Sequence, residues 1–268
     1  MRAVIAGIGL CAPGLPDWTR GRAVLAGTEA WRCGDVAPPL PALLAPNERR
    51  RAGLPVRLAL TVAEEAMRTA GLPPDAARAV FASANGESEI LHGLLETLAE
   101  DEPSGGPPAI SPTRFHNSVH NAVAGYWSIG VASQQPVTCL GAHDDTLGAA
   151  LLKAFAEVSV ERTPVLCCVY DVPAPEPLRA KVATESPFAA ALVLLPQAFG
   201  GLAEMEVAWR AGAPGPTRQP YADWLERLRV GNRLAALLPL LATIAAGQSA
   251  QAEYGLLDGT VAVQVAPC

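Results

Sequence analysis

Short, almost continuously apolar runs bounded by glycine or proline recur along this chain and alternate with stretches of helical spacing. Five such runs predict buried strands, at residues 2–14, 77–88, 135–141, 163–174 and 187–196. A strand with apolar side chains on both faces is covered on both faces. This is the situation of a strand in a sheet between two helical layers. The sequence therefore predicts an α/β protein with a three-layer α/β/α architecture and a mixed, largely parallel sheet.

Helical spacing of apolar residues separates these strands. The pattern predicts helices over 17–31, 56–70, 144–158 and 221–246, and a helix-compatible segment over 111–130. Two more strands are predicted at 202–212 and 259–267, and the acidic, Pro- and Gly-rich stretch 99–112 is predicted to be an exposed loop. We expect the whole chain, residues 1–268, to form a single domain.

The charge balance excludes one broad class of partner. The chain has 268 residues, half of them apolar, and a formal charge of -6. Its longest basic cluster is Arg49–Arg51, far short of the basic surface that nucleic acid binding requires.

The most apolar stretch, residues 234–247, contains Pro239 and is too short to cross a bilayer. We therefore expect neither a nucleic acid partner nor a membrane span.

Cysteine spacing indicates the redox compartment. The six cysteines show no CxxC pair and are Cys11, Cys33, Cys139, Cys167, Cys168 and Cys268. The opening residues place Gly and Pro too early for the apolar segment of a signal peptide. We therefore expect a reducing, cytoplasmic setting and no native disulfide. Cys167 and Cys168 lie in a strand, where neighbouring side chains point to opposite faces, and are expected to fill the core.

Two short patterns have the outline of a ligand site but lack part of it. His116 and His120 have the i, i+4 spacing of a metal-ligand pair. Asn117 and Asn121 share that spacing, but no third ligand accompanies either pair in the sequence. The opening strand supplies only two of the three glycines of a dinucleotide fingerprint. We expect no metal and no cofactor.

Several segments resemble a known family in their order and residues. "AVIAGIGLCAPG", "SPTRFHNSVHNAVAGYWSI" and "DDTLGAALLKA" are similar to the opening strand, the subunit-contact segment and the nucleophile helix of the N-terminal half of β-ketoacyl synthases, which have the thiolase fold. Together with "VLCCVYDVPAPEPL" they resemble, more narrowly, the short ketosynthase-like proteins of aryl polyene and related pigment clusters. The resemblance covers residues 2–268 and implies a thiolase-like half fold.

The resemblance places segment 111–130 at a subunit contact. The residues that it implies for this interface are Phe115, Asn117, Asn121, Tyr126 and Trp127. Tyr126 and Trp127 fit the core of the chain equally well. The implied partner is a ketosynthase subunit or a second copy of the chain, and an acyl carrier protein is a further candidate.

The nucleophile of a ketosynthase is a Cys at the N-terminus of a buried helix, where orphan N–H groups favour a thiolate. In an alignment without gaps, that position falls on Leu140, and Cys139 lies one residue early, on the opposite face of its strand. A one-residue bulge would return Cys139 to the position. The adjacent Asp144 or Asp145 is expected to cap the helix that begins near Thr146.

Ketosynthases also draw two catalytic histidines from the C-terminal half of their fold, and this chain has no counterpart of either. Its histidines are His92, His116, His120 and His143, all in the part that resembles the N-terminal half. The resemblance therefore implies a non-catalytic accessory subunit of a type II polyketide, fatty acid-like or polyene pathway. It would act through dimerisation and acyl-chain binding, with Leu140, His116 and His120 as substrate contacts.

Two other functions stay open. In the first, the chain is an acyltransferase or thioesterase: Cys139 accepts an acyl group from an acyl carrier protein thioester, and His143, His116 or His120 acts as the base. In the second, the chain is a remnant with a structural role only. Access to Cys139 and its distance from a histidine nitrogen separate the enzyme from the other two functions.

Overall fold

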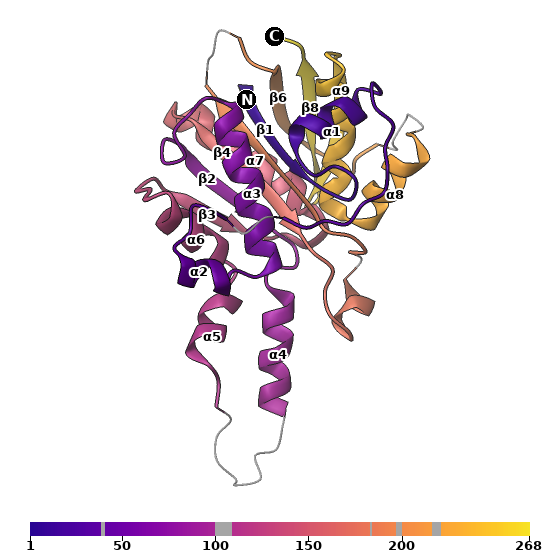
Figure 1. Ribbon diagram of the computed structural model, residues 1–268. Helices are drawn as coiled ribbons and strands as arrows, with labels where there is room; N and C mark the ends of the chain where they lie inside the picture. The colour runs from indigo at the N-terminus through magenta and orange to yellow at the C-terminus, as the bar shows by residue number, and fades with distance from the viewer. Residues whose placement is uncertain (39–40, 100–108, 183, 197–199, 216–220) are drawn as a thin grey trace.

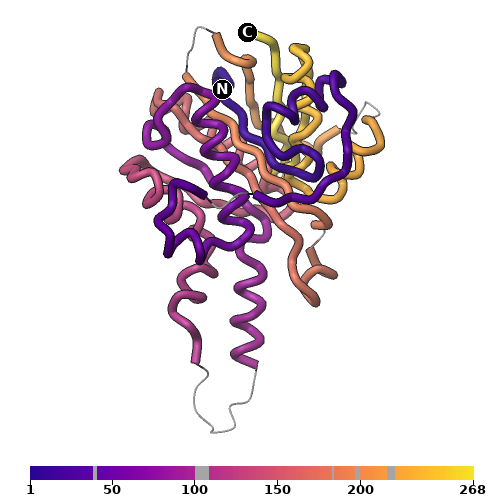
Figure 2. The backbone as a smooth tube through the Cα atoms, in the orientation of Figure 1, coloured from indigo at the N-terminus to yellow at the C-terminus, as the bar shows by residue number. Residues whose placement is uncertain are grey.

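One mixed β-sheet runs through the centre of the protein (Figures 1 and 2). The computed structural model describes residues 1–38, 41–99, 109–182, 184–196, 200–215 and 221–268. Within them, the strands are β1 (Arg2–Cys11), β2 (Arg78–Ala82), β3 (Val137–Leu140), β4 (Val165–Asp171), β5 (Phe188–Leu195), β6 (Ala203–Ala211), β7 (Ala250–Leu256) and β8 (Gly259–Ala266). Their order across the sheet is β3-β2-β4-β5-β1-β6-β8-β7.

The directions of the strands correct one part of the prediction. The sheet is mixed, as predicted, but only the pairs β2–β3 and β2–β4 are parallel. The pairs β4–β5, β5–β1, β1–β6, β6–β8 and β8–β7 are antiparallel, so the expected largely parallel sheet is wrong. A continuous apolar run shows that both faces of a strand are buried, and a strand of either direction satisfies that condition.

Helices cover both faces of the sheet, which confirms the predicted three layers. The helices are α1 (Trp18–Leu25), α2 (Pro46–Arg51), α3 (Leu54–Thr69), α4 (Ser88–Ala99), α5 (Pro112–Ser118), α6 (Ala122–Gly130), α7 (Thr146–Glu161), α8 (Asp223–Gly231) and α9 (Leu238–Ala245). Short 3-10 turns are η1 (His143–Asp145), η2 (Leu178–Lys181) and η3 (Arg233–Leu237). Helices α3 and α6 share one hydrophobic cluster with the sheet, and α1, α7 and α9 share the other.

Helix α3 lies unusually close to the central strand β1. A Cβ atom on Gly9 would overlap the backbone of Val62, so only glycine permits this approach. The buried Glu65 carboxylate then ties α3 to the end of β1, accepting hydrogen bonds from the backbone N–H groups of Leu10 (3.0 Å) and Trp18 (2.8 Å). Both oxygens are thereby satisfied, as a buried carboxylate requires.

Helix α7 fills the opposite face. Its apolar residues, spaced three and four apart, are buried and include Leu147, Leu151, Phe155 and Val158. Phe155 is fully buried, and burying a side chain of this size contributes roughly 1.5–3 kcal/mol. Helix α9 and the turn η3 extend the same layer over the C-terminal strands.

The C-terminal part of the chain differs from the predicted single helix over 221–246. Helix α8 ends at Gly231, Asn232 takes an extended conformation, and its side chain caps η3 through Leu234 N (3.0 Å). Pro239 occupies the first turn of α9, where its missing N–H costs nothing. The strand β7 that follows was not predicted, although its first residues alternate between less and more exposed ones, as in a half-buried strand.

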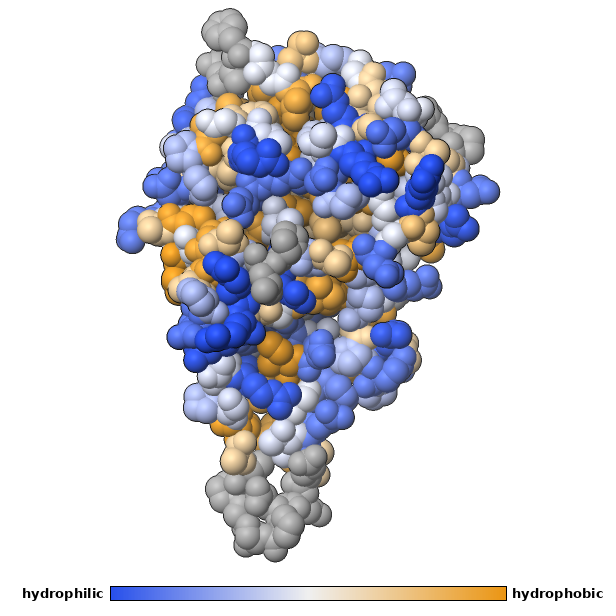
Figure 3. All heavy atoms as spheres, viewed as in Figure 1, coloured by the Kyte–Doolittle hydropathy of each residue, from blue (hydrophilic) through white to orange (hydrophobic). Residues whose placement is uncertain are grey.

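Helices α4 and α5 lie side by side and project from the body as an arm (Figure 1). The sequence did not predict α4. Its Leu91, Leu95 and Leu98 share one helical face, yet each is about half exposed. Figure 3 shows hydrophobic residues among polar ones on the surface of the arm. Most of the loop predicted over 99–112 lies outside the described residues.

Candidate functional site

The parallel strands β2, β3 and β4 end at the same edge of the sheet, and most of the predicted site residues lie there. In open α/β sheets, ligands bind outside the carboxyl ends of the strands. Cys139 and Leu140 are the last two residues of β3, an edge strand of the sheet. Helix α7 begins a few residues later, after the turn η1.

Cys139 and Leu140 point to opposite faces of the sheet. Leu140 packs against the cluster that contains α7, whereas Cys139 packs against the cluster that contains α3 and α6. The register of β3 with β2 continues without a bulge through both residues. The side chain facing the layer of α7 is therefore that of Leu140.

The environment of Cys139 disfavours a thiolate. The residue is half-buried, and burial raises the pKa of its thiol above the ordinary value. A hydrogen bond from the backbone N–H of Ala124, at the start of α6, lowers the pKa by less. A nucleophilic cysteine needs the reverse balance.

The turn before α7 is tied to the C-terminal hairpin β7–β8. Asp145 occupies the N-cap position, as predicted for Asp144 or Asp145, but its side chain makes no capping bond. Its carboxylate instead accepts a hydrogen bond from Leu257 N (2.8 Å), in the turn between β7 and β8. A Cβ on Gly148 would collide with the carbonyl oxygen of Gly255, so this hairpin packs directly on the first turn of α7.

His143 lies at the surface. Its side chain is 75% exposed, and its Nδ1 lies 2.8 Å from Asp144 Oδ1. Arg233 bonds to the same carboxylate. Among the described residues no hydrogen bond joins a histidine to Cys139, so the predicted pair of Cys139 and His143 is not assembled here.

His116 and His120 are both exposed and face different neighbours. The ring of His120 lies against two glycines, at 3.3 Å from the positions that a Cβ on Gly86 or on Gly141 would take. His116 Nδ1 lies 3.2 Å from Asn117 Oδ1. Within the described part of the chain, no group of three or more His, Cys, Asp or Glu side chains is placed to hold a metal ion.

A buried polar network that the sequence analysis missed completes this edge. Asp171, the last residue of β4, accepts hydrogen bonds from Ser83 Oγ (2.6 Å), Ala84 N (3.1 Å) and Asn85 N (3.0 Å). Burial raises the pKa of Asp171 to about 6, although these hydrogen bonds and the nearby His120 lower it. Two polar residues at the ends of neighbouring strands are the signal that could have found the pair of Ser83 and Asp171.

Asn232 extends the network towards the C-terminal layer. Its Nδ2 donates to the carbonyl oxygens of Asp171 (3.3 Å) and Ser186 (2.9 Å). Asn85 donates to Thr184 Oγ1 (3.0 Å). The network therefore joins the segments around residues 83–85, 171, 184–186 and 232 at the carboxyl edge.

The predicted interface residues divide into two groups. Phe115 is 61% exposed and Asn121 is also exposed. Tyr126 and Trp127 are buried in the cluster of α3, and Asn117 is buried and accepts a hydrogen bond from the Tyr126 hydroxyl (3.2 Å). These three side chains are thus buried within the chain: helix α6 turns Tyr126 and Trp127 towards the sheet, and Asn117, on α5, bonds to Tyr126. A role of segment 111–130 in a subunit contact stays a prediction.

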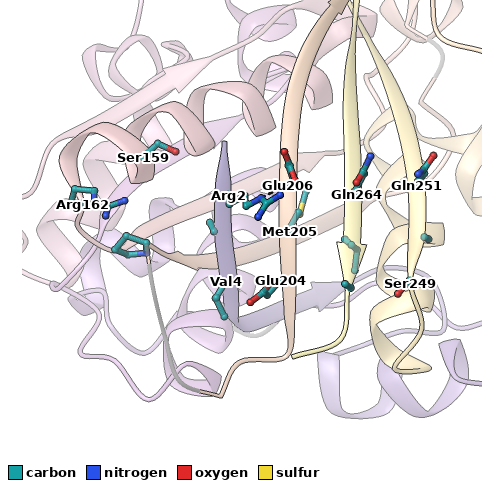
Figure 4. A pocket seen from close by; sticks show the side chains of 15 residues that line it. Arg2, Val4, Ser159, Arg162, Glu204, Met205, Glu206, Ser249, Gln251 and Gln264 are labelled. Carbon is teal, nitrogen blue, oxygen red and sulfur yellow. Dashed lines mark hydrogen bonds and ion pairs between the residues drawn. The ribbon is translucent and has the colours of Figure 1, made fainter.

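Two hollows of ligand size lie away from Cys139. A groove of about 990 Å³ borders the starts of β1 and β6 and the far end of α7, where Arg2 and Glu206 form an ion pair at 2.9 Å (Figure 4). A second hollow, of about 550 Å³, is lined by Trp31 and Trp224, whose rings stack at 5.5 Å. Residues 139–145 line neither of them.

Two further properties concern the chain as a whole. All six cysteines are free thiols. No helix in the described ranges has the length and apolar character needed to span a bilayer.

The fold is that of the thiolase-like ketosynthases. One chain of the complex of the ketosynthase ApeO with its chain length factor ApeC, from Xenorhabdus doucetiae, matches with a TM-score of 0.71 and 20% identity, covering 98% of this chain and 99% of that chain. A β-ketoacyl synthase from Burkholderia phymatum STM815 matches with a TM-score of 0.60 and 15% identity, over 92% of this chain and 71% of that chain. A third match, with a TM-score of 0.73 and 13% identity, covers 100% of this chain and 99% of a chain from a type II PKS acyl carrier protein in complex with its ketosynthase.

The family follows from the sequence itself. A profile of the family described as beta-ketoacyl synthase, N-terminal domain, matches residues 24–248. This range is most of the chain, so the chain belongs to the β-ketoacyl synthase N-terminal domain family. No curated protein matched it in a sequence search.

Proposed function

We propose that this chain is a non-catalytic, ketosynthase-like accessory subunit of a type II polyketide or aryl polyene-type pathway. It pairs with a ketosynthase subunit or with a second copy of itself. Two of the similar structures are a ketosynthase with its chain length factor and a ketosynthase with its acyl carrier protein, which supports partners of these kinds.

The observation that carries the proposal is the orientation of Leu140. In this family the nucleophile is expected beside the helix that follows the strand, and here the side chain on that side is an alkyl group. Cys139 faces the other layer, with its pKa raised by burial. Because thiol attack requires a thiolate in contact with the substrate, neither residue supports condensation.

The contacts of the hairpin β7–β8 support the same proposal. The N-terminus of α7 would have to leave its N–H groups open to stabilise an oxyanion. Here Asp145 places a carboxylate at that end and is bonded to Leu257, while Gly255 covers Gly148. A negative charge at this end opposes the development of a second one on the substrate.

Pairing is supported by the surfaces near the site. Strand β3 is a four-residue edge strand, and in the described part of the chain no strand pairs with its outer side, which can therefore bond to another chain. Phe115 and the leucines of α4 add exposed apolar side chains on the neighbouring arm. Exposed apolar residues grouped in this way are typical of protein interfaces. Acyl-chain contacts would come from Leu140, His116 and His120 along this edge.

The acyltransferase alternative has one observation in its favour. Cys139 accepts a hydrogen bond from the backbone N–H of Ala124, in the first turn of a helix, and His120 lies over Gly141 on the same face. A helix N-terminus lowers a thiol pKa. The alternative requires that acylation overcomes the burial of Cys139.

Alkylation and acyl transfer distinguish the two functions. With iodoacetamide, and peptide mapping by mass spectrometry, we expect the exposed Cys33 and Cys268 to react well before Cys139. An acyl carrier protein thioester should leave no adduct on Cys139, and Cys139→Ser should not change product formation with a co-expressed ketosynthase. Stoichiometric acylation of Cys139 that disappears in Cys139→Ser would overturn the proposal and establish the acyltransferase.

A further inference from the structure

The arm formed by α4 and α5 is joined to the body at Glu87. The carbonyl oxygen of this residue accepts a hydrogen bond from Leu91 N (3.0 Å), which places Glu87 at the N-cap position, directly before α4. Of the described helices and strands, α5 is the only one against which α4 packs extensively. The contacts at the root therefore decide how firmly α4 is held.

The side chain of Glu87 turns away from the arm and into the body. It is only 6% exposed, and its Oε2 lies 3.0 Å from the position that a Cβ on Gly53 would take. Gly53 is the N-cap of α3 and offers no side chain to that helix. The backbone N–H of Val56, in the first turn of α3, lies close enough to lower the pKa of Glu87, so the carboxyl group of the residue before α4 sits at the N-terminus of α3.

No described cation forms an ion pair with this buried carboxyl group. Its Oε1 has no hydrogen-bond partner among the described residues, and neither has the hydroxyl of the adjacent Ser88. The titratable groups that interact with it are Glu89 on α4, Tyr126 on α6 and Tyr170 on β4. Arg51 on α2 also interacts with Tyr126, but it forms its ion pair with Glu48. Burial without a cation favours the neutral acid over the carboxylate.

We propose that Glu87 is a proton-controlled latch between the arm and helix α3. When neutral, its side chain stays packed beneath α3. When ionised, its unpaired oxygen draws water into the root, and the first turns of α4 open more readily. The surface that opens and closes with it carries Leu91, Leu95 and Leu98.

The direction of the pH dependence follows from the proton affinity of the packed state. Burial raises the pKa of Glu87 from 4.5 to about 7, the charge of Glu89 adds to this effect, and the nearby Val56 N–H opposes it. Between these two values the packed root binds more protons than the open root, so its stability falls as the pH rises. Above about pH 7 both states are ionised, and no further loss is expected.

Hydrogen exchange of the full chain tests the latch. Peptides covering residues 87–99 are followed from about pH 5 to about pH 8, and the rates are corrected for the intrinsic pH dependence of exchange. In the wild type we expect protection to fall by a factor on the order of 100 across this range. Glu87→Gln, which keeps the size and an acceptor oxygen, should give a level profile. Peptides from the buried strand β5 provide the internal reference.

Glu89→Gln is the matched control, because Glu89 is exposed and lies two residues away. It should retain most of the wild-type response. A level profile in the wild type, or an equal slope in Glu87→Gln, overturns the latch. If Glu87→Gln does not fold, a carbon-13 titration of the wild-type glutamate side chains decides, since an ordinary pKa for the assigned Glu87 resonance also overturns it.

Discussion

At the residue scale, Asp171 joins segments that lie far apart in the sequence. It accepts hydrogen bonds from Ser83, Ala84 and Asn85 at the end of β2, and its own carbonyl accepts one from Asn232. The residue is 2% exposed, so water does not replace a missing bond. The order of the carboxyl edge therefore depends strongly on this one carboxylate.

Asp171→Asn is expected to reduce the free energy of unfolding by about 2 kcal/mol, because the amide replaces one acceptor oxygen with a donor among donors. The pH dependence should change as well. Burial raises the pKa of Asp171 from 3.8 to about 6, so in this window the folded wild type binds the additional proton and loses stability as the pH rises. The variant should lose the part of the slope that Asp171 contributes and keep the part that Glu87 contributes, and urea unfolding at several pH values measures the difference.

Asp75→Asn is the control for this change, since Asp75 is exposed. It should shift the free energy of unfolding by less than about 0.5 kcal/mol at every pH. An equal slope in wild type and Asp171→Asn would show that another group titrates in this range.

The residues of the site were predictable where strand alternation alone decides. The side chains of Cys139 and Leu140 lie on opposite faces of the sheet, because neighbouring side chains in a strand point in opposite directions. The continuous register of β3 with β2 keeps this alternation. The pair of Ser83 and Asp171 was missed because its two members come from strands that only the folded sheet brings together. For Trp127 the sequence leaves the core and an interface equally open, because it does not tell which way a short helix rotates.

At the scale of elements, α7 and the hairpin β7–β8 are in unusually close contact. Gly148, in the first turn of α7, faces the carbonyl oxygen of Gly255 in β7. In the helix α6, Gly125 has no atom within 4 Å of the position that its Cβ would take. Substituting alanine at each of the two glycines therefore distinguishes the effect of close packing on stability from the effect of helix propensity.

Gly148→Ala should reduce the free energy of unfolding by about 1–3 kcal/mol, because the new methyl group overlaps a backbone atom that cannot move without shifting β7. Gly125→Ala should be neutral or stabilise by up to about 1 kcal/mol, since alanine favours the helix and meets nothing. Urea unfolding of both variants measures the difference. Equal effects at the two positions would contradict the close contact between α7 and the hairpin.

Element types were predicted well where length and period agreed, as for α3 and α7. The predicted helix over 221–246 was divided because Asn232 leaves the helical conformation to bond to Ser186, an interaction that no local pattern contains. Helix α4 was missed for a different reason. Its leucines follow a helical period but face outwards on an arm, away from any core within the chain.

At the scale of the whole molecule, association is the property that the proposed function requires. Light scattering of the chain alone, and with a co-expressed ketosynthase, should detect a complex in at least one case. Leu95→Asp should weaken that complex, because it places a charge in the exposed apolar face of the arm. Val160→Asp is the control, because Val160 is 76% exposed near the C-terminus of α7, a helix that does not pack extensively against α4 or α5.

A monomer in both mixtures contradicts the pairing, and an equal effect of Leu95→Asp and Val160→Asp excludes the arm from it. The three-layer architecture itself was predictable, because buried strands and amphipathic helices alternate along the chain. The antiparallel majority of the sheet was not, because the order in which strands neighbour one another is set by long-range packing.

The central position of β1 has a consequence for how the chain is made. This strand is synthesised before the other strands of the described sheet, yet both of its neighbours, β5 and β6, lie beyond residue 187. Its apolar residues therefore stay unpaired until the strands β5 and β6 have been synthesised. Loop closure over such a sequence distance slows folding, and an unpaired apolar strand attracts other chains in the meantime. Translation speed and chaperone supply, more than final stability, should thus govern how much of this protein reaches its folded form in a cell.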